Sequence, residues 1–303
     1  MNKRVIAISG PTAVGKTALA LRVARELDGE IISCDSMQIY KGMDIGTAKP
    51  TKEELSLVRH HMIDIVSPDT EFSCADYKKM ATEALEDILS RGKLPIFCGG
   101  TGLYLESVLY NGGFSEAPAD KELRERLSLN TPEENYARLM QIDPASAAKT
   151  HANNIPRVIR ALEIYEITGM TKTYWDELSK QKKSEYDPKI VVLYASDREV
   201  LYNRINDRVD LMVEAGLERE VKDLLGSVSP TALQAIGYKE FIEYFYGKCT
   251  FEDAIDKIKQ ASRNYAKRQQ TWWRHCENAF NVDVCSENFE DIVNFVISLA
   301  KTD

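Results

Sequence analysis

The sequence lacks the features of several protein classes. Its six cysteines form no C-x-x-C pair, and its four histidines show no spacing suited to zinc. No apolar stretch approaches the roughly 18 residues that cross a bilayer, and the chain does not begin with a long apolar segment. Internal repeats and low-complexity tracts are also absent. We therefore expect reduced, packed cysteines, a cytoplasmic location and no membrane partner.

The composition is that of an ordinary soluble globular protein. The chain has 303 residues, of which 44% are hydrophobic and 28% are charged. This is ample for a large core in one or two domains, and we expect a monomer. The net charge of −8 argues weakly against a nucleic-acid partner, but local patches govern contact with phosphates and a total hides them.

One motif near the N-terminus carries specific chemistry, because it matches the phosphate-binding pattern G-x-x-x-x-G-K-[ST]. The apolar run 5–8 predicts a buried strand before it, and helical spacing predicts a helix after it that ends near Asp28-Gly29. Backbone amides and the helix N-terminus then converge on anionic oxygens, with a charge from Lys16 and a hydroxyl for Mg²⁺ from Thr17. A chance match is the alternative. The motif consists of Gly10, Pro11, Thr12, Ala13, Val14, Gly15, Lys16 and Thr17.

An expected acid is missing from one predicted strand. ATP-hydrolysing enzymes and kinases usually place a second carboxylate at the end of a neighbouring apolar strand. The run 94–98 instead leads into Gly-Gly-Thr-Gly at 99–102, whereas the run 31–34 does end in an acid, Asp35. Parallel strands would bring both ends to one edge of the sheet, where α/β folds bind ligands. We expect Asp35 and Thr101 to face the phosphate loop, although Asp35 could cap a helix and Thr101 could satisfy a glycine-rich turn.

Strand-like and helix-like runs alternate along the chain. This predicts an α/β fold with a P-loop NTPase-like parallel sheet flanked by helices, and one further strand at 61–66. The stretch 113–189 differs, because it combines helical signals such as Pro156 at a helix start and Gly169 just past its end. We predict a P-loop-like core of residues 1–112 and 190–303 with basic C-terminal helices, and a helical insertion at 113–189.

The segment between Asp256 and His275 departs from the average charge. Several of its basic residues share roughly one helical face, and Tyr265, Trp272 and Trp273 supply aromatic surface nearby. A solvated surface helix explains this pattern as well as a nucleic-acid-binding face does. The basic residues are Lys257, Lys259, Arg263, Lys267, Arg268 and Arg274.

Six ordered blocks of sequence resemble the tRNA dimethylallyltransferase family, also called tRNA isopentenyltransferases, along essentially the whole chain. Members of that family move a dimethylallyl group from dimethylallyl diphosphate to the N6 amine of the adenosine 3′ of the anticodon, with Mg²⁺. Ser262 departs from the family, which more often has Thr before Arg263. The blocks are GPTAVGKT at 10–17, DSMQIY at 35–40 with DIGTAKP at 44–50, GGTGLY at 99–104, RVIRALE at 157–163, QAIGYK at 234–239, and YAKRQ at 265–269 with Thr271-Trp272.

The resemblance implies that the loop holds the diphosphate of a prenyl donor, so that no water needs activation. Backbone amides, Lys16, Mg²⁺ at Thr17 and Arg208 would stabilise the leaving group. Arg208 is preferred to Arg204, which could pair with a neighbouring aspartate. Asp35 is the predicted general base for the adenine amine, and Thr101 is predicted to fix an in-line approach.

The same resemblance implies a tRNA-binding surface and a catalytic role for the core, with the helical insertion at 113–189 contacting tRNA. The target adenosine must leave its stack to reach the diphosphate pocket, so we expect it to flip. A helical ion-pair ladder with Glu163 and Glu166 is the rival interpretation for two of the arginines, Arg157 and Arg160, and Arg124 could belong to a solvated helix. The predicted tRNA-binding residues are Asp35, Ser36, Met37, Gln38, Thr101, Arg124, Arg157, Arg160, Gly237, Tyr238, Lys239, Arg263, Lys267 and Arg268.

Two other functions stay open at this level. An adenylate isopentenyltransferase would modify free AMP or ATP, but it would leave the basic helix and the insertion without a clear task. A small-molecule kinase would bind ATP in the loop, but Gly-Gly-Thr stands where its acid is expected.

Overall fold

The computed structural model describes residues 3–110, 117–181, 184–276 and 278–302, and the chain divides into two compact units. Unit 1 comprises Met1–Leu105 and Tyr186–Asp303, and unit 2 comprises Glu106–Glu185. The helical unit therefore begins seven residues before the predicted 113 and ends four before the predicted 189. Residues 186–189 belong to unit 1 because they form the start of strand β5, where Tyr186 pairs with Lys3.

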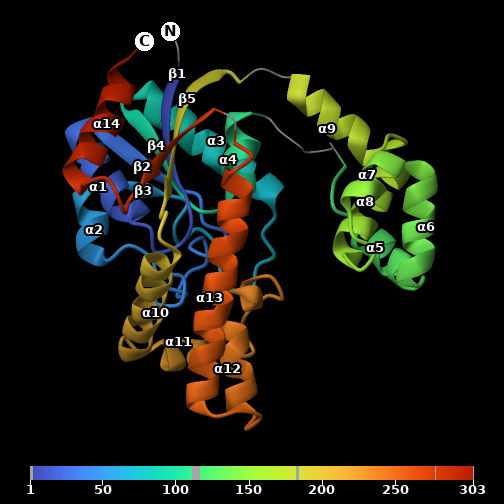
Figure 1. The fold of residues 1–303 in the computed structure, drawn as a ribbon. Coiled ribbons are helices and arrows are strands. Elements are labelled where there is room, and N and C mark those ends of the chain that lie inside the picture. The colour runs from blue at the N-terminus through green and yellow to red at the C-terminus, as the bar shows by residue number, and fades with distance from the viewer. Residues whose placement is uncertain (1–2, 111–116, 182–183, 277, 303) are drawn as a thin grey trace. The chain divides into compact units, whose positions relative to one another are not determined.

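Unit 1 is built on a six-stranded sheet with the order β3-β2-β4-β1-β5-β6, in which every neighbouring pair is parallel (Figure 1). This confirms the predicted parallel α/β sheet. The apolar runs at 5–8, 31–34 and 94–98 all fall on strands, although β2 ends one residue early. The strands are β1 (Lys3–Ser9), β2 (Gly29–Ser33), β3 (His60–His61), β4 (Leu94–Gly99), β5 (Tyr186–Tyr194) and β6 (Ala279–Asp283).

The strand predicted at 61–66 is wrong. Only His60 and His61 pair with β2, because Met62 and Asp64 adopt left-handed φ angles of 63° and 55° that interrupt an extended chain. The backbone amides of residues 64–66 donate instead to the carbonyl groups of Gln38 and Ile39. This segment therefore supports the loop that follows β2 and does not extend the sheet.

Helices cover both faces of the sheet (Figure 1). Helices α1 (Lys16–Glu26) and α14 (Phe289–Lys301) share one hydrophobic core with the strands, which includes Ile6, Ile8 and Val191. Helices α3 (Cys74–Ser90) and α4 (Gly102–Leu109) lie against the other face, and the short α2 (Lys52–Leu57) precedes β3. Ser73 and Asp76 form a capping box at the start of α3.

Further helices lie beyond the carboxyl ends of the strands (Figure 1). They are α10 (Arg198–Glu214), α11 (Leu217–Leu224), the 3₁₀ helix η1 (Ala232–Gln234), α12 (Tyr238–Phe245) and α13 (Phe251–Trp273). Their core includes Leu217 and Phe241 from the helices, together with Ile39, Tyr40 and Met43 from the loop after β2. The loop after β2 is therefore anchored in a second core, outside the sheet.

Unit 2 is helical, as predicted for the insertion. Its helices are α5 (Lys121–Ser128), α6 (Pro132–Ile142), α7 (Pro144–Lys149), α8 (Ile155–Thr168) and α9 (Lys172–Gln181). Leu123, Leu139 and Leu162 lie in its hydrophobic core. Pro156 lies in the first turn of α8, and Gly169 caps that helix with a φ of 70°, which a glycine adopts without strain.

The next two features are the state of the cysteines and the apolar character of the helices. The described cysteines form no disulfide, and Cys34 is buried while Cys285 is exposed. In the parts of the chain that the structure describes, no helix has both the length and the apolar character that a bilayer crossing needs.

Candidate active site at the carboxyl edge of the sheet

The phosphate-binding motif forms a tightly curled loop between β1 and α1. Gly10 has a φ of 138°, and a Cβ atom there would lie 2.2 Å from the carbonyl oxygen of Leu193 on the neighbouring strand, so only glycine fits. Ala13 and Gly15 also adopt left-handed φ angles, of 63° and 97°. Such a loop, followed by a helix N-terminus, presents backbone N–H groups to an anion.

A cavity of about 260 Å³ opens beside this loop, within unit 1. The loop after β2 contributes Asp35 to its wall, the glycine turn after β4 contributes Gly99 and Gly100, and α10 contributes Arg208. These segments meet because the parallel strands all end at the same edge, as predicted. Its lining also includes Thr12, Lys16, Thr17, Ser36, Met37, Gln38, Lys239, Tyr265, Arg268 and Gln269.

Two cations meet at the phosphate loop. Lys16 Nζ donates a hydrogen bond to the carbonyl oxygen of Pro11 across 2.7 Å, and Arg208 Nη1 donates to Thr12 Oγ1 across 2.9 Å. Burial and, to a lesser degree, Arg208 lower the pKa of Lys16 to about 8, against the opposing effect of Asp35. Burial also lowers the pKa of Arg208. Partly desolvated cations of this kind gain free energy when an anion binds between them.

The preference for Arg208 over Arg204 agrees with this geometry. Arg208 reaches the phosphate loop from α10, whereas Arg204 on the same helix is exposed and does not line the cavity. The two arginines lie one helical turn apart on the same face of α10, so their position along the helix distinguishes them.

Asp35 combines the two roles that the sequence left open. Its Oδ1 accepts hydrogen bonds from the backbone N–H groups of Met37 at 2.9 Å and Gln38 at 3.3 Å, so it caps a turn, although not a helix. The side chain also lines the cavity, where its charge acts on Lys16 and Arg208. Among the residues that the structure describes, no hydrogen bond to its second oxygen, Oδ2, is formed. In the described structure, one Asp35 oxygen is therefore bonded within the turn and the other forms no hydrogen bond.

Thr101 also has a structural bond and an unused group. Its backbone N–H donates to the carbonyl oxygen of Cys34 across 3.0 Å, which ties the turn after β4 to the end of β2. Its hydroxyl is buried and has no hydrogen-bond partner of normal geometry in the described part of the chain. The Tyr265 hydroxyl is close enough to Thr101 to interact electrostatically, and burial, followed by the charge of Asp35, raises the pKa of Tyr265 to about 12.

The sequence analysis did not single out Gln269. This side chain of α13 is only 5% exposed; its Oε1 accepts from the backbone N–H of Thr12 at 2.9 Å, and its Nε2 donates to the carbonyl oxygen of Gly100 at 3.2 Å. A Cβ atom on Gly100 would lie 1.9 Å from that nitrogen. The available signal was a polar residue on the helix face that also carries the buried Ala266 and Trp273.

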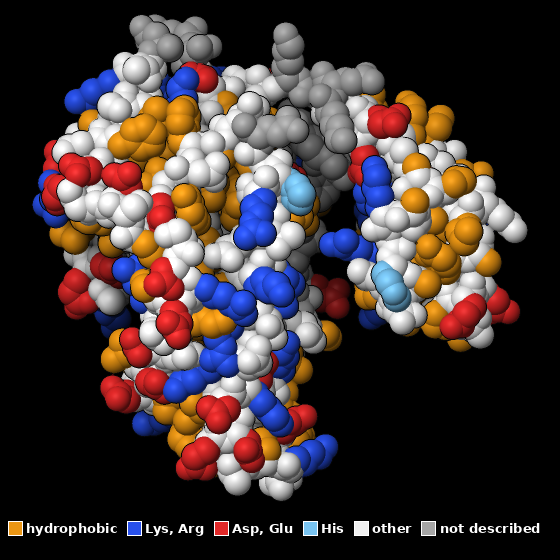
Figure 2. Space-filling view, viewed as in Figure 1, with side chains coloured by type: hydrophobic (Ala, Val, Ile, Leu, Met, Phe, Trp, Pro, Cys, Tyr) orange, Lys and Arg blue, Asp and Glu red, His pale blue; other side chains and the backbone are white. Residues whose placement is uncertain are grey.

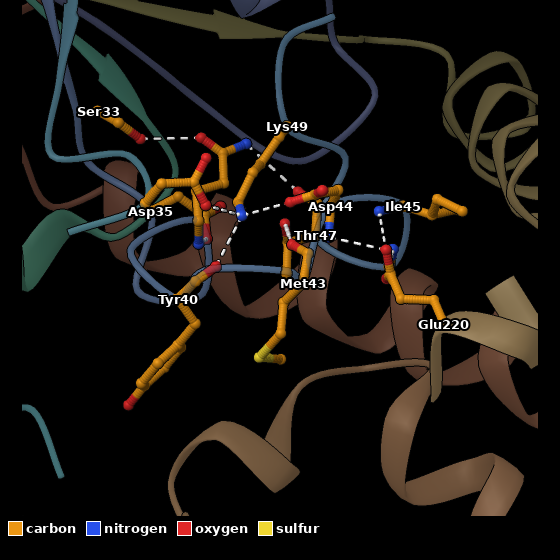
Figure 3. A network of polar contacts seen from close by, with 12 residues as sticks. Ser33, Asp35, Tyr40, Met43, Asp44, Ile45, Thr47, Lys49 and Glu220 are labelled. Atoms are coloured by element: carbon orange, nitrogen blue, oxygen red, sulfur yellow. Dashed lines mark hydrogen bonds and ion pairs between the residues drawn. The ribbon is translucent and has the colours of Figure 1, made fainter. Parts of the chain in front are cut away.

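The loop after β2 is braced by a network of polar contacts near Asp35 (Figure 3). Gln38 Nε2 donates to the carbonyl oxygens of Thr47 and Ala48, at 3.3 and 3.1 Å, and Gln38 Oε1 accepts from Ser33 Oγ at 2.9 Å. The ammonium group of Lys49, whose side chain is 4% exposed, contacts Asp44, Asp64 and the carbonyl oxygen of Tyr40. The DIGTAKP block is thus a support for the DSMQIY block.

The predicted tRNA-binding residues near α12 have different environments. Tyr238 is 1% exposed and donates its hydroxyl hydrogen to Glu220, so its side chain stabilises the fold and is not available to RNA. The backbone N–H of Gly237 donates to Glu240 at the start of α12. Lys239 lines the cavity and is about half exposed.

The three arginines of unit 2 that were predicted to bind tRNA also lie in different environments. Arg124 and Arg160 both donate to the carboxylate of Glu163, which has no exposed surface, so the ion-pair interpretation describes what they do in this structure. Burial raises the pKa of Glu163, but hydrogen bonds from the two arginines outweigh it and hold the pKa below its usual value. Arg157 is exposed on the first turns of α8.

Basic side chains gather along α13 (Figure 2), and the contacts of its cations are of two kinds. Lys259 pairs with Asp210 at 2.6 Å, and Arg263 donates to Asn206 at 2.6 Å, so both bind α10. Lys267 and Arg268 are exposed, and Arg268 lies over the ring of Tyr265, 5.6 Å from its centroid.

The prediction that aromatic side chains form a surface near these cations is largely wrong. Trp273 is only 4% exposed and Tyr265 forms part of the cavity wall, which leaves Trp272 at 37% exposure. Trp272 packs closely on the turn after β4, because a Cβ atom on Gly102 would lie 1.9 Å from its indole nitrogen. These rings therefore hold α13 against the sheet more than they offer a stacking surface.

Residues 38–276 match the model of a family described as IPP transferase. The tRNA dimethylallyltransferase of Oceanobacillus iheyensis is 49% identical over 304 residues, covering 97% of this chain and 96% of the relative, and that of Thermoanaerobacter sp. (strain X514) is 50% identical over 279 residues, covering 89% of each. The full-length tRNA isopentenylpyrophosphate transferase from Bacillus halodurans has a similar structure, with a TM-score of 0.74, 42% identity and coverage of 98% of this chain and 95% of that one. A eukaryotic dimethylallyltransferase acting on tRNA gives a TM-score of 0.82 at 32% identity, covering 98% and 80%. This chain belongs to the IPP transferase family.

Proposed function

We propose that this chain transfers a dimethylallyl group from dimethylallyl diphosphate to the N6 amine of the adenosine 3′ of the anticodon in tRNA. The observation that supports this most directly is one cavity with a phosphate loop and two desolvated cations on one wall and the Asp35 carboxylate on another. The identity of 49% to a tRNA dimethylallyltransferase over nearly the whole chain supports the same reaction.

The phosphate loop would bind the donor through its diphosphate. In the transfer, the C–O bond to the diphosphate breaks as the C–N bond to adenine forms, so negative charge develops on the leaving group. Lys16, Arg208 and backbone N–H groups of residues 13–17 would stabilise that charge. The Lys16 and Arg208 side chains are already bonded to Pro11 and Thr12 of the phosphate loop. No attacking water is needed, which accounts for Gly-Gly-Thr in place of an acid after β4.

Mg²⁺ is the proposed metal cofactor, and the residues present suit it. Thr17 lines the cavity next to Lys16 and offers a hydroxyl oxygen. The described residues contain no group of three or more His, Cys, Asp or Glu that could enclose a metal ion. Mg²⁺ commonly keeps water ligands and binds through substrate phosphates, so the donor diphosphate would complete its shell. The ion would supply charge neutralisation at the leaving group.

Asp35 is the proposed general base. The adenine amine loses a proton as its new C–N bond forms, and Asp35 Oδ2 is the proposed acceptor of that proton, because Oδ1 is occupied by two backbone N–H groups. The buried Thr101 hydroxyl would hydrogen-bond near the reacting amine. A base inside an RNA loop reaches such a cavity only after it leaves its stack, so we propose that the adenosine flips.

The tRNA would be held by residues at the cavity mouth and by exposed cations. Ser36, Met37 and Gln38 line the cavity next to Asp35, and Lys267, Arg268 and the unit 2 residue Arg157 are exposed to phosphates. We expect a monomer that acts in the cytoplasm on unmodified tRNA.

The decisive experiment is a transfer assay with labelled dimethylallyl diphosphate and either unmodified tRNA, AMP or no acceptor. Label is expected on tRNA only, and nuclease digestion with mass spectrometry should locate it on the adenosine 3′ of the anticodon. Label on AMP but not on tRNA would overturn the proposal in favour of an adenylate isopentenyltransferase. Hydrolysis of ATP with no transfer of label would favour a kinase-like enzyme.

A further inference from the structure

A carboxylate from α11 holds the loop after β2 from outside (Figure 3). Glu220 Oε2 accepts hydrogen bonds from the backbone N–H groups of Asp44 at 2.9 Å and Ile45 at 2.8 Å, and Glu220 Oε1 accepts from that of Gly46 at 3.0 Å. Oε1 also accepts from the Tyr238 hydroxyl at 2.5 Å. One side chain thus satisfies three successive amides, more than 170 residues away in the sequence.

The approach of Glu220 requires close packing of the loop. A Cβ atom on Gly46 would lie 2.5 Å from the ring of Tyr238 and 3.0 Å from Leu217, so this position tolerates only glycine. The loop backbone therefore lies directly on α11 and α12. Because these contacts are close, a small displacement of Glu220 would also move residues 44–46.

The clamp is connected to the catalytic turn through Gln38. The residues that follow the clamped amides, Thr47 and Ala48, accept hydrogen bonds from Gln38 Nε2 through their carbonyl oxygens. Gln38 in turn donates its backbone N–H to Asp35 Oδ1. The contacts run from Glu220 through residues 44–48 to Gln38 and Asp35, all within unit 1.

The donor side of the cavity does not share these contacts. Lys16 and Arg208 are bonded to Pro11 and Thr12 of the phosphate loop, and no hydrogen bond or ion pair found in the described chain joins them to residues 44–49 or to Glu220. Residues Gly46, Thr47 and Ala48 nevertheless line the cavity, beside Met37 and Gln38. In the described chain, hydrogen bonds therefore connect Glu220 to the acceptor side of the cavity and not to Lys16 or Arg208 on the donor side.

We propose that Glu220 is a positioning residue for the tRNA acceptor. This proposal rests on the proposed function, and it goes further by assigning Glu220 to the binding of the acceptor and not of the donor. The charged carboxylate matters, because it offers lone pairs to four donors at once. A glutamine of equal size turns an NH₂ group toward some of these donors and cannot satisfy all of them.

The experiment compares Glu220→Gln with wild type and with Asp223→Asn in the full chain. Asp223 is the matched control, because it lies on the same helix, is exposed and loses the same charge. Steady-state kinetics give KM for tRNA at saturating dimethylallyl diphosphate, and KM for the donor at saturating tRNA. Binding of dimethylallyl diphosphate without tRNA is measured separately by calorimetry.

For Glu220→Gln we expect kcat/KM for tRNA to fall roughly 10- to 100-fold, the range for losing a hydrogen bond to a charged group. Donor affinity should stay within about twofold of wild type, because the phosphate loop is untouched. Asp223→Asn should match wild type in both. Equal losses for donor and acceptor, or no loss for tRNA, would overturn the proposal.

A milder variant covers the case in which Glu220→Gln does not fold. Tyr238→Phe removes one of the four donors and keeps the ring that packs on Gly46. It should lower kcat/KM for tRNA by about 3- to 10-fold while donor affinity is retained. A wild-type chain that fails to modify tRNA would refute the proposed function itself, whereas an active wild type with unaffected Glu220 and Tyr238 variants would refute only the positioning role.

Discussion

Gln269 donates a hydrogen bond from Nε2 to the carbonyl oxygen of Gly100 across 3.2 Å, in the interior of the candidate site. The other end of the same amide accepts from the backbone N–H of Thr12. One buried side chain of α13 therefore fixes the distance between the phosphate loop and the turn that carries Thr101. An in-line transfer requires the donor and the acceptor at a fixed distance and angle, and this amide is one of the groups that hold that geometry.

Replacing Gln269 tests that relationship. Gln269→Ala leaves the Thr12 amide and the Gly100 carbonyl without their partner and should lower kcat by roughly 10- to 100-fold. Gly100→Ala should be at least as damaging, because its Cβ would collide with the Gln269 amide. The matched control is Gln270→Ala, the next residue on α13, which has no bond to either loop. Transfer rates at saturating substrates are the measurement, and wild-type rates in Gln269→Ala would contradict the role.

Replacing Asp35 should separate the effect on proton transfer from the effect on tRNA binding. Asp35→Asn can still accept the backbone bonds of the turn through its amide oxygen, but it cannot take a proton at neutral pH. We expect single-turnover transfer to fall by about 10²- to 10⁴-fold, the usual range for general base catalysis. Binding of tRNA, measured by filter retention, should change little. An active Asp35→Asn variant would remove Asp35 from proton transfer.

Lys16 makes donor affinity depend on pH. Its pKa is lowered to about 8, chiefly by burial, so the ammonium form that attracts a diphosphate is lost as pH rises through that value. The dissociation constant of dimethylallyl diphosphate should therefore be flat below pH 7.5 and rise by up to about tenfold per pH unit above pH 8. Cys98 and Tyr265, with pKa values raised to about 11 and about 12, do not titrate in that window.

A variant identifies the group behind this pH dependence. Lys16→Met removes the titrating ammonium, so its weaker donor binding should no longer vary between pH 7.5 and 9.5. Calorimetry at fixed Mg²⁺ gives both profiles. An unchanged slope in Lys16→Met would assign the titration to another residue.

Lys267 and Arg263, two of the basic residues of α13, should differ in their effect on tRNA binding. Lys267 is exposed, so Lys267→Ala should reduce the slope of log Kd against log salt by about 0.7 to 0.9, the value for one phosphate contact. Arg263 is engaged with Asn206 on α10, so Arg263→Ala should keep the slope and lower the melting temperature instead. The opposite assignment would show that the free-state contacts of Arg263 do not persist with RNA.

The arginines of unit 2 can be tested in the same way. Arg124→Ala leaves the buried Glu163 with fewer partners and should reduce the stability of unit 2 by about 1 to 2 kcal/mol, since part of the bond is solvent-screened. Arg157→Ala, on the exposed start of α8, should keep the stability and weaken tRNA binding. Denaturant unfolding and RNA-binding assays on both variants distinguish the two roles. Equal stabilities for the two variants would contradict the structural role of Arg124.

The stability conferred by Glu163 should also depend on pH. Hydrogen bonds from Arg124 and Arg160 hold its folded pKa below the usual value, despite burial. A carboxylate of this kind contributes stability that is fully present above its unfolded pKa and is lost as pH falls through the folded pKa. The destabilisation of Arg124→Ala should therefore shrink on acidification, as seen in unfolding curves between pH 7 and pH 3.

The sequence by itself determined the features that depend on local pattern. Glycine and lysine spacing in residues 10–17 predicted the phosphate loop, alternating apolar runs predicted the parallel sheet, and Pro156 and Gly169 marked helix ends. These predictions succeed because a cap, a turn or a strand in a parallel sheet is decided by neighbours within a few residues. The family resemblance gave roles to Asp35, Thr101 and Arg208. Asp35 and Arg208 line one cavity, whereas Thr101 is not part of its lining and has a buried hydroxyl.

Only the tertiary structure decided which polar groups meet. Nothing local relates Glu220 to the amides of residues 44–46, or Gln269 to Gly100, because these partners are distant in the sequence and are joined by the packing of helices on the carboxyl edge of the sheet. The same cause redirected residues 62–66 from a strand to a loop support, and buried Tyr238 and Trp273 away from solvent. Side-chain charge and periodicity fix what a residue can do, and the long-range contacts of the folded chain fix which of those possibilities it carries out.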